Sequence, residues 1–276
     1  MSNRLLKNFN TFLEQYNEKG YFIVPNVFEV EPILNVANKL LKTPPKIRSF
    51  LEKDGRPRTI WSPHYDSFYL NDFVRNESIN PLIPILRKVL GGDIYLNQCH
   101  FNYKLANGGG KFNWHSDYTV FKTHDKWKDL RGLSVFYLLD DMTLENGNMH
   151  FAVGSHKKIV PLKQGYSLPN TFTEARYGDI KKYDRGLEQG DYWTAPSEIS
   201  EEMPLSNDLY RVEKATAKAG DCVVFHGNVW HMSPTNNSNK DRKVFILCYN
   251  HIDNTTEYPI TNHRDDWMTL KDFTPC

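Results

Sequence analysis

The chain has 276 residues, a length that fits one large domain or two small ones. With 39% hydrophobic and 24% charged residues, it has the composition of an ordinary soluble globular protein. Its net charge of +1 argues against binding to nucleic acid or to an anionic membrane, because both need a clustered excess of lysine and arginine.

Residues 1–92 predict a layer of helices. Apolar residues recur at three- and four-residue spacing from Leu5 to Tyr16, and Gly20 ends this helix. The same spacing predicts helices over 32–42 and 79–90, and the apolar run 21–25 predicts a short strand.

Between about residues 93 and 252 the pattern changes to β. Runs rich in β-branched and aromatic residues, separated by turn residues, predict strands over 93–105, 132–139, 148–153, 221–225 and 243–251. Residues 157–209 are irregular, and so long a loop is typical of a lid or a binding loop. We therefore expect a single domain, 1–276, in which the helical layer packs on a β-sandwich or barrel with a lid-like insertion.

No stretch approaches the roughly 18 apolar residues of a membrane span. The first residues are followed by a polar, amphipathic segment rather than by the apolar core of a signal peptide. The cysteines show no CxxC pairing, and three of them lie in apolar runs, which predicts a reduced, buried state. They are Cys99, Cys222, Cys248 and Cys276. These features favour a cytoplasmic protein.

Two ionisable residues, His115 and Asp117, stand in an otherwise aromatic run. On a strand, residues i and i+2 point to the same face, so the two side chains would project together. Buried charge needs a partner or a metal ion, and an imidazole beside a carboxylate offers a divalent metal two ligands. The alternative is a purely structural His–Asp hydrogen bond, and the spacing alone does not separate the two.

Two later histidines, His226 and His231, are candidates for a third ligand. If Phe225 faces the interior, strand parity places His231 and Ser233 on the same side and His226 on the other, although the intervening glycine could reset the parity. Two histidines and one carboxylate form a facial triad that leaves positions open on Fe(II) for a co-substrate and O₂. In this interpretation His226 packs against a neighbouring strand, and His156 closes a turn.

Arg242 follows His231 by eleven positions, across a turn-rich segment. Two antiparallel strands joined by that segment would bring Arg242 beside His231. A guanidinium holds a carboxylate in a bidentate fork, which suits a chelating 2-oxo acid with a distal carboxylate. The alternative is an ordinary surface arginine.

Ordered blocks between about residues 18 and 252 resemble the phytanoyl-CoA dioxygenase family of Fe(II)/2-oxoglutarate oxygenases. The blocks are 98–104, 114–118, 138–141, 145–147, 154–156, 219–226, 231–233, Arg242 and 249–250. Within that family the chain looks most like the branch of ectoine hydroxylases and free-proline hydroxylases.

The resemblance implies a double-stranded β-helix core (a jelly roll, cupin-like) that uses Fe(II), 2-oxoglutarate and O₂. It makes His115, Asp117 and His231 the iron ligands and Arg242 the anchor of the distal carboxylate of 2-oxoglutarate. The residues that it places along the 2-oxoglutarate site are Asn102, Phe112, Ser134 and Ser233. Those that it places toward the substrate are Gln98, His100, Phe121 and Phe225.

Three departures from the ectoine hydroxylases concern the substrate. The ectoine hydroxylases carry Arg at the position of His100, Trp at that of Phe121 and an aromatic residue at that of Ile246. The resemblance therefore implies a smaller, less cationic pocket and a substrate other than ectoine. Related halogenases lack a carboxylate at the position of Asp117, so its presence here favours hydroxylation over halogenation.

We therefore expect a dioxygenase that hydroxylates an unactivated C–H bond of a small polar molecule, such as a free amino acid or a similar zwitterion, and releases succinate and CO₂. An acyl-CoA or a carrier-tethered acyl group is an alternative substrate, for which Lys157, Lys158, Lys181, Lys182 and Arg185 could supply a basic surface. Desaturation or ring formation could arise from the same chemistry. A catalytically inactive jelly-roll binding protein is the non-enzyme alternative, which the intact triad and arginine disfavour.

Overall fold

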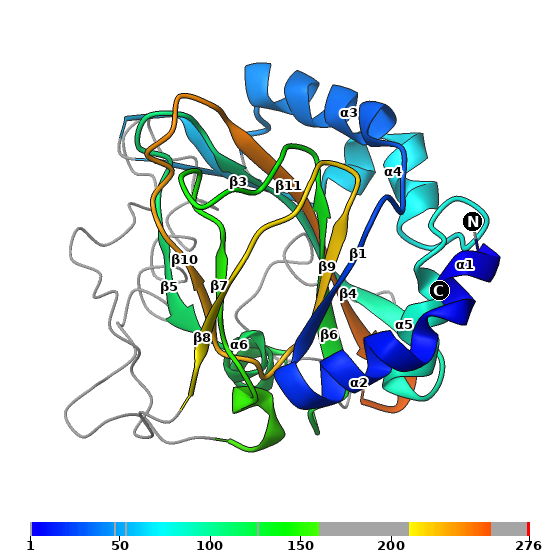
Figure 1. Ribbon diagram of the computed structural model, residues 1–276. Helices are drawn as coiled ribbons and strands as arrows, with labels where there is room; N and C mark the ends of the chain where they lie inside the picture. Colours follow the sequence, from blue (N-terminus) through cyan, green and yellow to red (C-terminus); the bar gives the residue numbers. More distant parts are fainter. Residues whose placement is uncertain (1, 47, 53, 126, 160–209, 255–274) are drawn as a thin grey trace.

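Two antiparallel β-sheets face each other in the computed structural model, and N-terminal helices cover the outer side of the larger sheet (Figure 1). The structure describes all residues except 1, 47, 53, 126, 160–209 and 255–274. The helices and strands are α1 (Ser2–Lys7), α2 (Phe9–Lys19), β1 (Tyr21–Val24), α3 (Val30–Lys42), β2 (Ser49–Leu51), β3 (Pro57–Trp61), η1 (Pro63–Asp66), α4 (Phe68–Phe73), α5 (Ile83–Leu90), β4 (Ile94–Lys104), β5 (Phe112–His115), α6 (Asp117–His124), β6 (Gly132–Leu138), β7 (Met149–Ala152), η2 (Ser155–Lys157), β8 (Val212–Ala215), β9 (Cys222–His226), β10 (His231–Ser233), β11 (Arg242–His251) and η4 (Ile252–Asn254).

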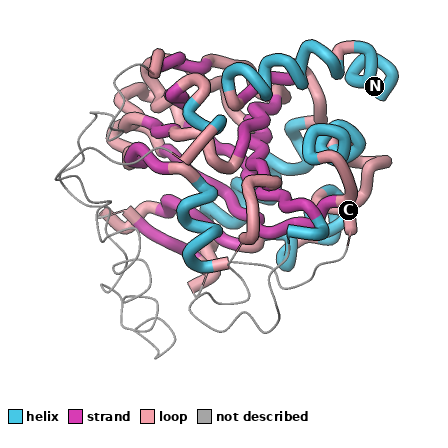
Figure 2. The backbone as a smooth tube through the Cα atoms, turned by 90° about the horizontal axis from the view of Figure 1, so that it is seen from below, coloured by secondary structure: helices cyan, strands magenta, loops and turns pink. Residues whose placement is uncertain are grey.

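The larger sheet has seven strands in the order β1-β9-β6-β11-β4-β3-β2, and the smaller has four in the order β5-β10-β7-β8. Sequence neighbours are rarely spatial neighbours in this order, which is the mark of a double-stranded β-helix rather than of a meander. The fold predicted from the sequence is confirmed. Both described ends of the chain lie on the side of the N-terminal helices (Figures 1 and 2).

Strand alternation divides the apolar side chains of the larger sheet between two cores. One face of β4 and β11, with residues such as Phe101, Phe245 and Leu247, packs under the helices. Even-numbered residues of β11, such as Ile246 and Cys248, face the smaller sheet and pack with its apolar residues. The candidate site lies in this second, inter-sheet core.

The first helices follow the predicted pattern. Gly20 takes a left-handed conformation (φ 89°) and its N–H donates to the carbonyl of Tyr16, so it ends α2 as a C-cap. The third helix begins at Ile83 rather than at residue 79, because Pro84 fits the first turn of a helix and the residues before it form turns.

Five of the predicted β-strands, β4, β6, β7, β9 and β11, agree with the structure to within about one residue at each end. The N-terminal layer contributes three strands to the larger sheet: β1, which the run 21–25 predicted, and β2 and β3, which were not predicted. Nearly all of the predicted lid-like insertion, 157–209, lies outside the described residues. The four cysteines are free and buried, as predicted. Within the described ranges, no helix has the length and apolar character of a membrane span.

Candidate active site

His115, Asp117 and His231 come together at one end of the smaller sheet. His115 is the last residue of β5 and pairs in register with His231, the first residue of β10. Their ring centroids are 4.2 Å apart. Asp117 Oδ1 lies 3.7 Å from His115 Nε2 and 3.9 Å from His231 Nε2. One ligand atom from each residue lies within 4.8 Å of the others, a span that one metal ion can bridge.

Asp117 reaches this position differently from the prediction. β5 ends at His115, and Asp117 opens α6, so the two residues are not positions i and i+2 of one strand as predicted. The turn between them is stabilised by Ser116, whose hydroxyl caps α6 by accepting a hydrogen bond from the Thr119 N–H (3.3 Å). The N–H of Tyr118 donates to the carbonyl of Gly227 (2.7 Å), which ties this turn to the one before β10.

Both histidines present Nε2 to the cluster because Nδ1 is engaged elsewhere. His115 Nδ1 lies 2.5 Å from the Asn113 carbonyl, and His231 Nδ1 lies 3.0 Å from the Val229 carbonyl. A carbonyl only accepts, so each Nδ1 carries the proton and each Nε2 keeps its lone pair. Fixing the tautomer through the second ring nitrogen is the arrangement found in metal-binding histidines, so the cluster fits a divalent metal ion.

Arg242 lies at the other end of the inter-sheet interior. It opens β11 opposite Lys104 of β4, and strand parity directs it to the same face as Val244 and Ile246. The expected hairpin is wrong: β10 belongs to the smaller sheet and β11 to the larger, so Arg242 is not paired with His231. The two sites still lie close, because Lys104 Nζ donates to the Ser233 carbonyl (3.3 Å), two residues and roughly 7 Å along the strand from His231.

Nε and Nη1 of Arg242 are buried and have no hydrogen-bond partner among the described residues. Burial lowers the pKa of Arg242 to about 10, against the nearby charge of Asp140, so the guanidinium stays charged at neutral pH. A buried charge without a partner is costly, and a bound carboxylate would satisfy it. Arg242 therefore fits the anchor of an anionic co-substrate.

Lys104 is a functional candidate that the sequence reasoning missed. Its ammonium is completely buried and donates to the carbonyls of Gly110 (2.6 Å), Pro234 (2.5 Å) and Ser233. Burial, together with the charges of Arg242 and Arg58, lowers the pKa of Lys104 well below its usual value. Its position two residues beyond Asn102, with the same strand parity, was the available signal, but lysine is normally exposed.

The residues expected along the 2-oxoglutarate site lie on the strands between these two ends. Phe112 pairs with Ser233 and is covered by the guanidinium of Arg58, 4.1 Å from its ring. The Asn102 amide oxygen accepts from the Thr59 hydroxyl (2.8 Å). Ser134, on β6, donates its hydroxyl proton to Asp117 Oδ2 at 2.6 Å.

The residues expected to face the substrate are also buried. Gln98, on the strand next to β11, has a buried Nε2 without a partner in the described ranges. The His100 ring lies 4.6 Å from that of Trp61, which forms an aromatic wall. Phe225 contacts His231 edge-on (4.8 Å).

One row of side chains crosses the larger sheet near the triad. The register aligns Gln98, Cys248, Ser134 and Phe225 on β4, β11, β6 and β9. Phe121, from α6, instead stacks on Trp127 (4.4 Å).

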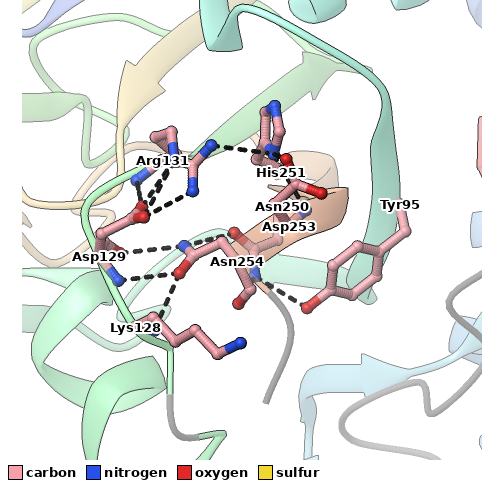
Figure 3. A network of polar contacts seen from close by, with 8 residues as sticks. All are labelled: Tyr95, Lys128, Asp129, Arg131, Asn250, His251, Asp253 and Asn254. Atoms are coloured by element: carbon pink, nitrogen blue, oxygen red, sulfur yellow. Dashed lines mark hydrogen bonds and ion pairs between the residues drawn. The ribbon is translucent and has the colours of Figure 1, made fainter. Parts of the chain in front are cut away.

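The segment that follows α6 is fixed to the end of β11. The Asn254 side chain accepts from the N–H groups of Lys128 (2.9 Å) and Asp129 (2.8 Å) and donates to the Asp129 carbonyl (3.0 Å), as Figure 3 shows. It also donates to Asn250 Oδ1 (2.8 Å), and Asn250 in turn donates to the Tyr95 hydroxyl. We call this set of contacts the Asn254 clasp. It holds residues 128–129, in the segment that follows α6.

A double-stranded β-helix that encloses a His-Asp-His cluster, with a buried arginine beyond it, is the architecture of Fe(II)- and 2-oxoglutarate-dependent dioxygenases, and this protein is one of them. The chain belongs to the phytanoyl-CoA dioxygenase (PhyH) family, whose model matches residues 16–244.

Two curated relatives are similar over most of their length. An ectoine dioxygenase of Stutzerimonas stutzeri is 27% identical over 259 residues, 91% of this chain and 80% of the relative. An L-proline trans-4-hydroxylase of Streptomyces griseoviridis is 28% identical over 197 residues, 70% of this chain and 67% of the relative. The crystal structure of EctD from S. alaskensis with 2-oxoglutarate and 5-hydroxyectoine superimposes with a TM-score of 0.72 at 21% identity, covering 94% of this chain and 82% of the other. That likeness confirms the fold.

Proposed function

We propose that this dioxygenase hydroxylates an unactivated C–H bond of a small zwitterion, such as a free amino acid. His115, Asp117 and His231 hold Fe(II), and Arg242 holds the distal carboxylate of 2-oxoglutarate. The relatives whose names specify ectoine and L-proline support the substrate class, since both molecules are small cyclic zwitterions.

The observation that carries the proposal is the buried guanidinium of Arg242, whose Nε and Nη1 have no hydrogen-bond partner among the described residues. It lies on β11 of the larger sheet and faces the same inter-sheet interior as the triad, where a dicarboxylate bound to iron through its keto-acid group would place its second carboxylate. Lys104, which donates to three carbonyls, lies opposite Arg242 on the paired strand β4.

The substrate end combines aromatic faces with a buried donor, Gln98 Nε2, that no described residue pairs with. Gln98 Nε2 can donate to a substrate carboxylate, and leaving it unpaired in the interior costs free energy. The ring faces of Trp61 and Phe225 can pack against an ammonium or its carbon frame. Phe121, Ile246 and His100 are smaller or less cationic than their counterparts in the ectoine hydroxylases, which favours a substrate other than ectoine.

The chain's own residues bind, orient and exclude water in the proposed reaction. The triad would hold Fe(II) and leave positions free for co-substrates, while Arg242 would orient 2-oxoglutarate. The bound iron supplies the activation of O₂ that couples decarboxylation of 2-oxoglutarate, to succinate and CO₂, with hydroxylation. The apolar inter-sheet core, with Phe136, Phe151 and Phe225, keeps water away from the reacting atoms.

The proposal is tested with purified protein, Fe(II), 2-oxoglutarate and a panel of free amino acids and cyclic zwitterions, with succinate and product mass as the readouts. We expect substrate-dependent succinate and a product heavier by one oxygen atom. A product lighter than the substrate by two hydrogen atoms would show that the reaction is desaturation or ring formation instead of hydroxylation. Turnover of acyl-CoA substrates alone would overturn the substrate class.

Matched variants distinguish loss of the metal site from a general loss of folding. His115→Ala and His231→Ala should lose metal binding and activity, because each removes one of three ligands. His150→Ala, on the neighbouring strand β7, should retain both. Metal binding that survives in both ligand variants would contradict the assignment of the triad.

The free, buried cysteines support a reducing compartment, and we propose that the protein is cytoplasmic. We further propose that residues 1–276 act as one domain, since strands from both the N-terminal layer and the core form the larger sheet.

A further inference from the structure

The two carboxylate oxygens of Asp117 have different surroundings. Oδ1 faces the ring nitrogens of both histidines, at 3.7 and 3.9 Å. Oδ2 accepts a 2.6 Å hydrogen bond from the Ser134 hydroxyl, which reaches it from β6 of the larger sheet. A carboxylate can bind a metal through one or both oxygens, and here one of them is already engaged.

Cys248 completes the arrangement from the neighbouring strand. Its Sγ lies 3.3 Å from Ser134 Oγ, and the two residues pair in register across β11 and β6. Ser134 has one proton, and the shorter bond, to the charged carboxylate, takes it. The contact between Ser134 Oγ and Cys248 Sγ is therefore the weaker of the two that the hydroxyl makes.

Ser134 and Cys248 are placed so that they restrain the carboxylate of Asp117. Ser134 is completely buried and Cys248 nearly so, which leaves the hydroxyl no water to turn toward. The backbone of Asp117 is fixed by the Ser116 cap and by the Tyr118–Gly227 hydrogen bond. Rotation of the carboxylate is the remaining freedom, and the hydrogen bond to Ser134 restrains it.

We propose that Ser134, supported by Cys248, is a positioning residue that keeps Asp117 a one-oxygen ligand. This proposal rests on the proposed metal site and adds to it: the resemblance only placed Ser134 along the 2-oxoglutarate site. If both oxygens of Asp117 bound the metal, one position needed by 2-oxoglutarate or O₂ would be occupied. Ser134 thus preserves the open positions of the metal and orients the carboxylate before the ion arrives.

Metal binding measured without O₂ or turnover tests the proposal, with Co(II) as the probe because its absorption reports the number of ligands. We expect Ser134→Ala to raise the Kd for Co(II) by about 10–100-fold, the usual effect of losing a hydrogen bond to a metal ligand. Its spectrum should shift toward a higher coordination number, and the Kd of 2-oxoglutarate for the Co(II)-loaded protein should rise. Cys248→Ala, which keeps the hydroxyl, should show the same changes at a smaller size.

Ser49→Ala is the matched control. Ser49 is equally buried and makes an equally short bond, from its hydroxyl to the Pro45 carbonyl (2.6 Å), but lies outside the site on β2. It should leave the Co(II) Kd and spectrum unchanged. If Ser134→Ala does not fold, Ser134→Cys, similar in shape and a weaker donor, gives the same comparison.

A Ser134 variant with the Co(II) Kd and spectrum of the wild type would overturn the positioning role. If His115→Ala and His231→Ala still lose the metal in that case, the proposed metal site stands and only this inference fails. If they also bind Co(II) normally, the metal site itself is wrong.

Discussion

Arg242 carries a buried charge for which the described part of the chain supplies no hydrogen-bond partner at Nε or Nη1. The free protein bears this cost, and under the proposed function the distal carboxylate of 2-oxoglutarate would relieve it. Replacing buried ionic groups with apolar side chains of similar volume is often neutral or stabilising by about 1–4 kcal/mol, because the cost of removing charge from water is relieved. Truncating one member of a buried charged pair costs about 2–5 kcal/mol of binding.

We therefore expect Arg242→Met to have opposite effects on folding and on binding. The free energy of unfolding of the metal-free protein should rise by about 1–4 kcal/mol, measured by urea titration. The Kd of 2-oxoglutarate should rise at least roughly 30-fold, measured anaerobically with Co(II) present. Arg211→Met, at an exposed arginine, should change neither. A variant that binds 2-oxoglutarate normally would remove Arg242 from the site.

At the scale of elements, the Asn254 clasp fixes the segment between α6 and β6 to the end of β11 (Figure 3). Asn254→Ala removes all four side-chain hydrogen bonds and leaves partly buried backbone groups unpaired. We expect a loss of about 1–3 kcal/mol in the free energy of unfolding, measured by urea titration. Asn254→Asp, which keeps the accepting oxygen but loses the donors, should lie between. Asn237→Ala, at an exposed asparagine, is the control and should be nearly neutral. An equal loss in both alanine variants would contradict the clasp.

The elements also separate what the sequence can predict from what it cannot. Strands β4, β6, β9 and β11 were predictable because their apolar runs are long and bounded by turn residues. The change from strand to helix at Ser116 was not, because a cap depends on one side chain over one turn. The three metal-cluster residues were found although the expected strand geometry of Asp117 was wrong, since α6 delivers the carboxylate to the same place.

The partner strand of Arg242 was mispredicted for a related reason. The turn-rich segment before β11 reads as a hairpin, but in this topology it crosses from the smaller sheet to the larger. Local turn chemistry is the same in both cases, and only the packing of the two sheets decides between them. Lys104 and Cys248 escaped notice because their roles depend on contacts between strands far apart in the sequence.

For the whole molecule, buried neutral histidines predict stability that depends on pH. Burial lowers the pKa of His64 to about 4, with smaller contributions from the charges of Arg75 and Arg48. The unfolded chain, with an ordinary histidine pKa near 6.5, then binds more protons than the folded protein between these two values. The contribution of neutral His64 to the free energy of unfolding is fully present above about pH 6.5 and is lost as the pH falls toward 4.

The loss attributable to His64 is on the order of 3 kcal/mol. Urea unfolding of the wild type from pH 7 to 4 measures it, and His64→Leu should flatten the slope in part, because His226, whose pKa burial and His156 lower to about 3, acts in the same direction. An identical slope in the variant would show that His64 does not titrate on unfolding.

The distribution of the triad and its supports over two sheets has a consequence for local motion. His115 and His231 belong to the short strands of the smaller sheet, whereas Ser134 and Arg242 belong to the larger one. A ligand that binds only the folded site stabilises first the parts that open most easily. Loading with metal and 2-oxoglutarate should therefore slow amide hydrogen exchange in β5 and β10 more than in the central strands β4 and β11. The exchange rates of β5 and β10 would then report how much of the site is occupied.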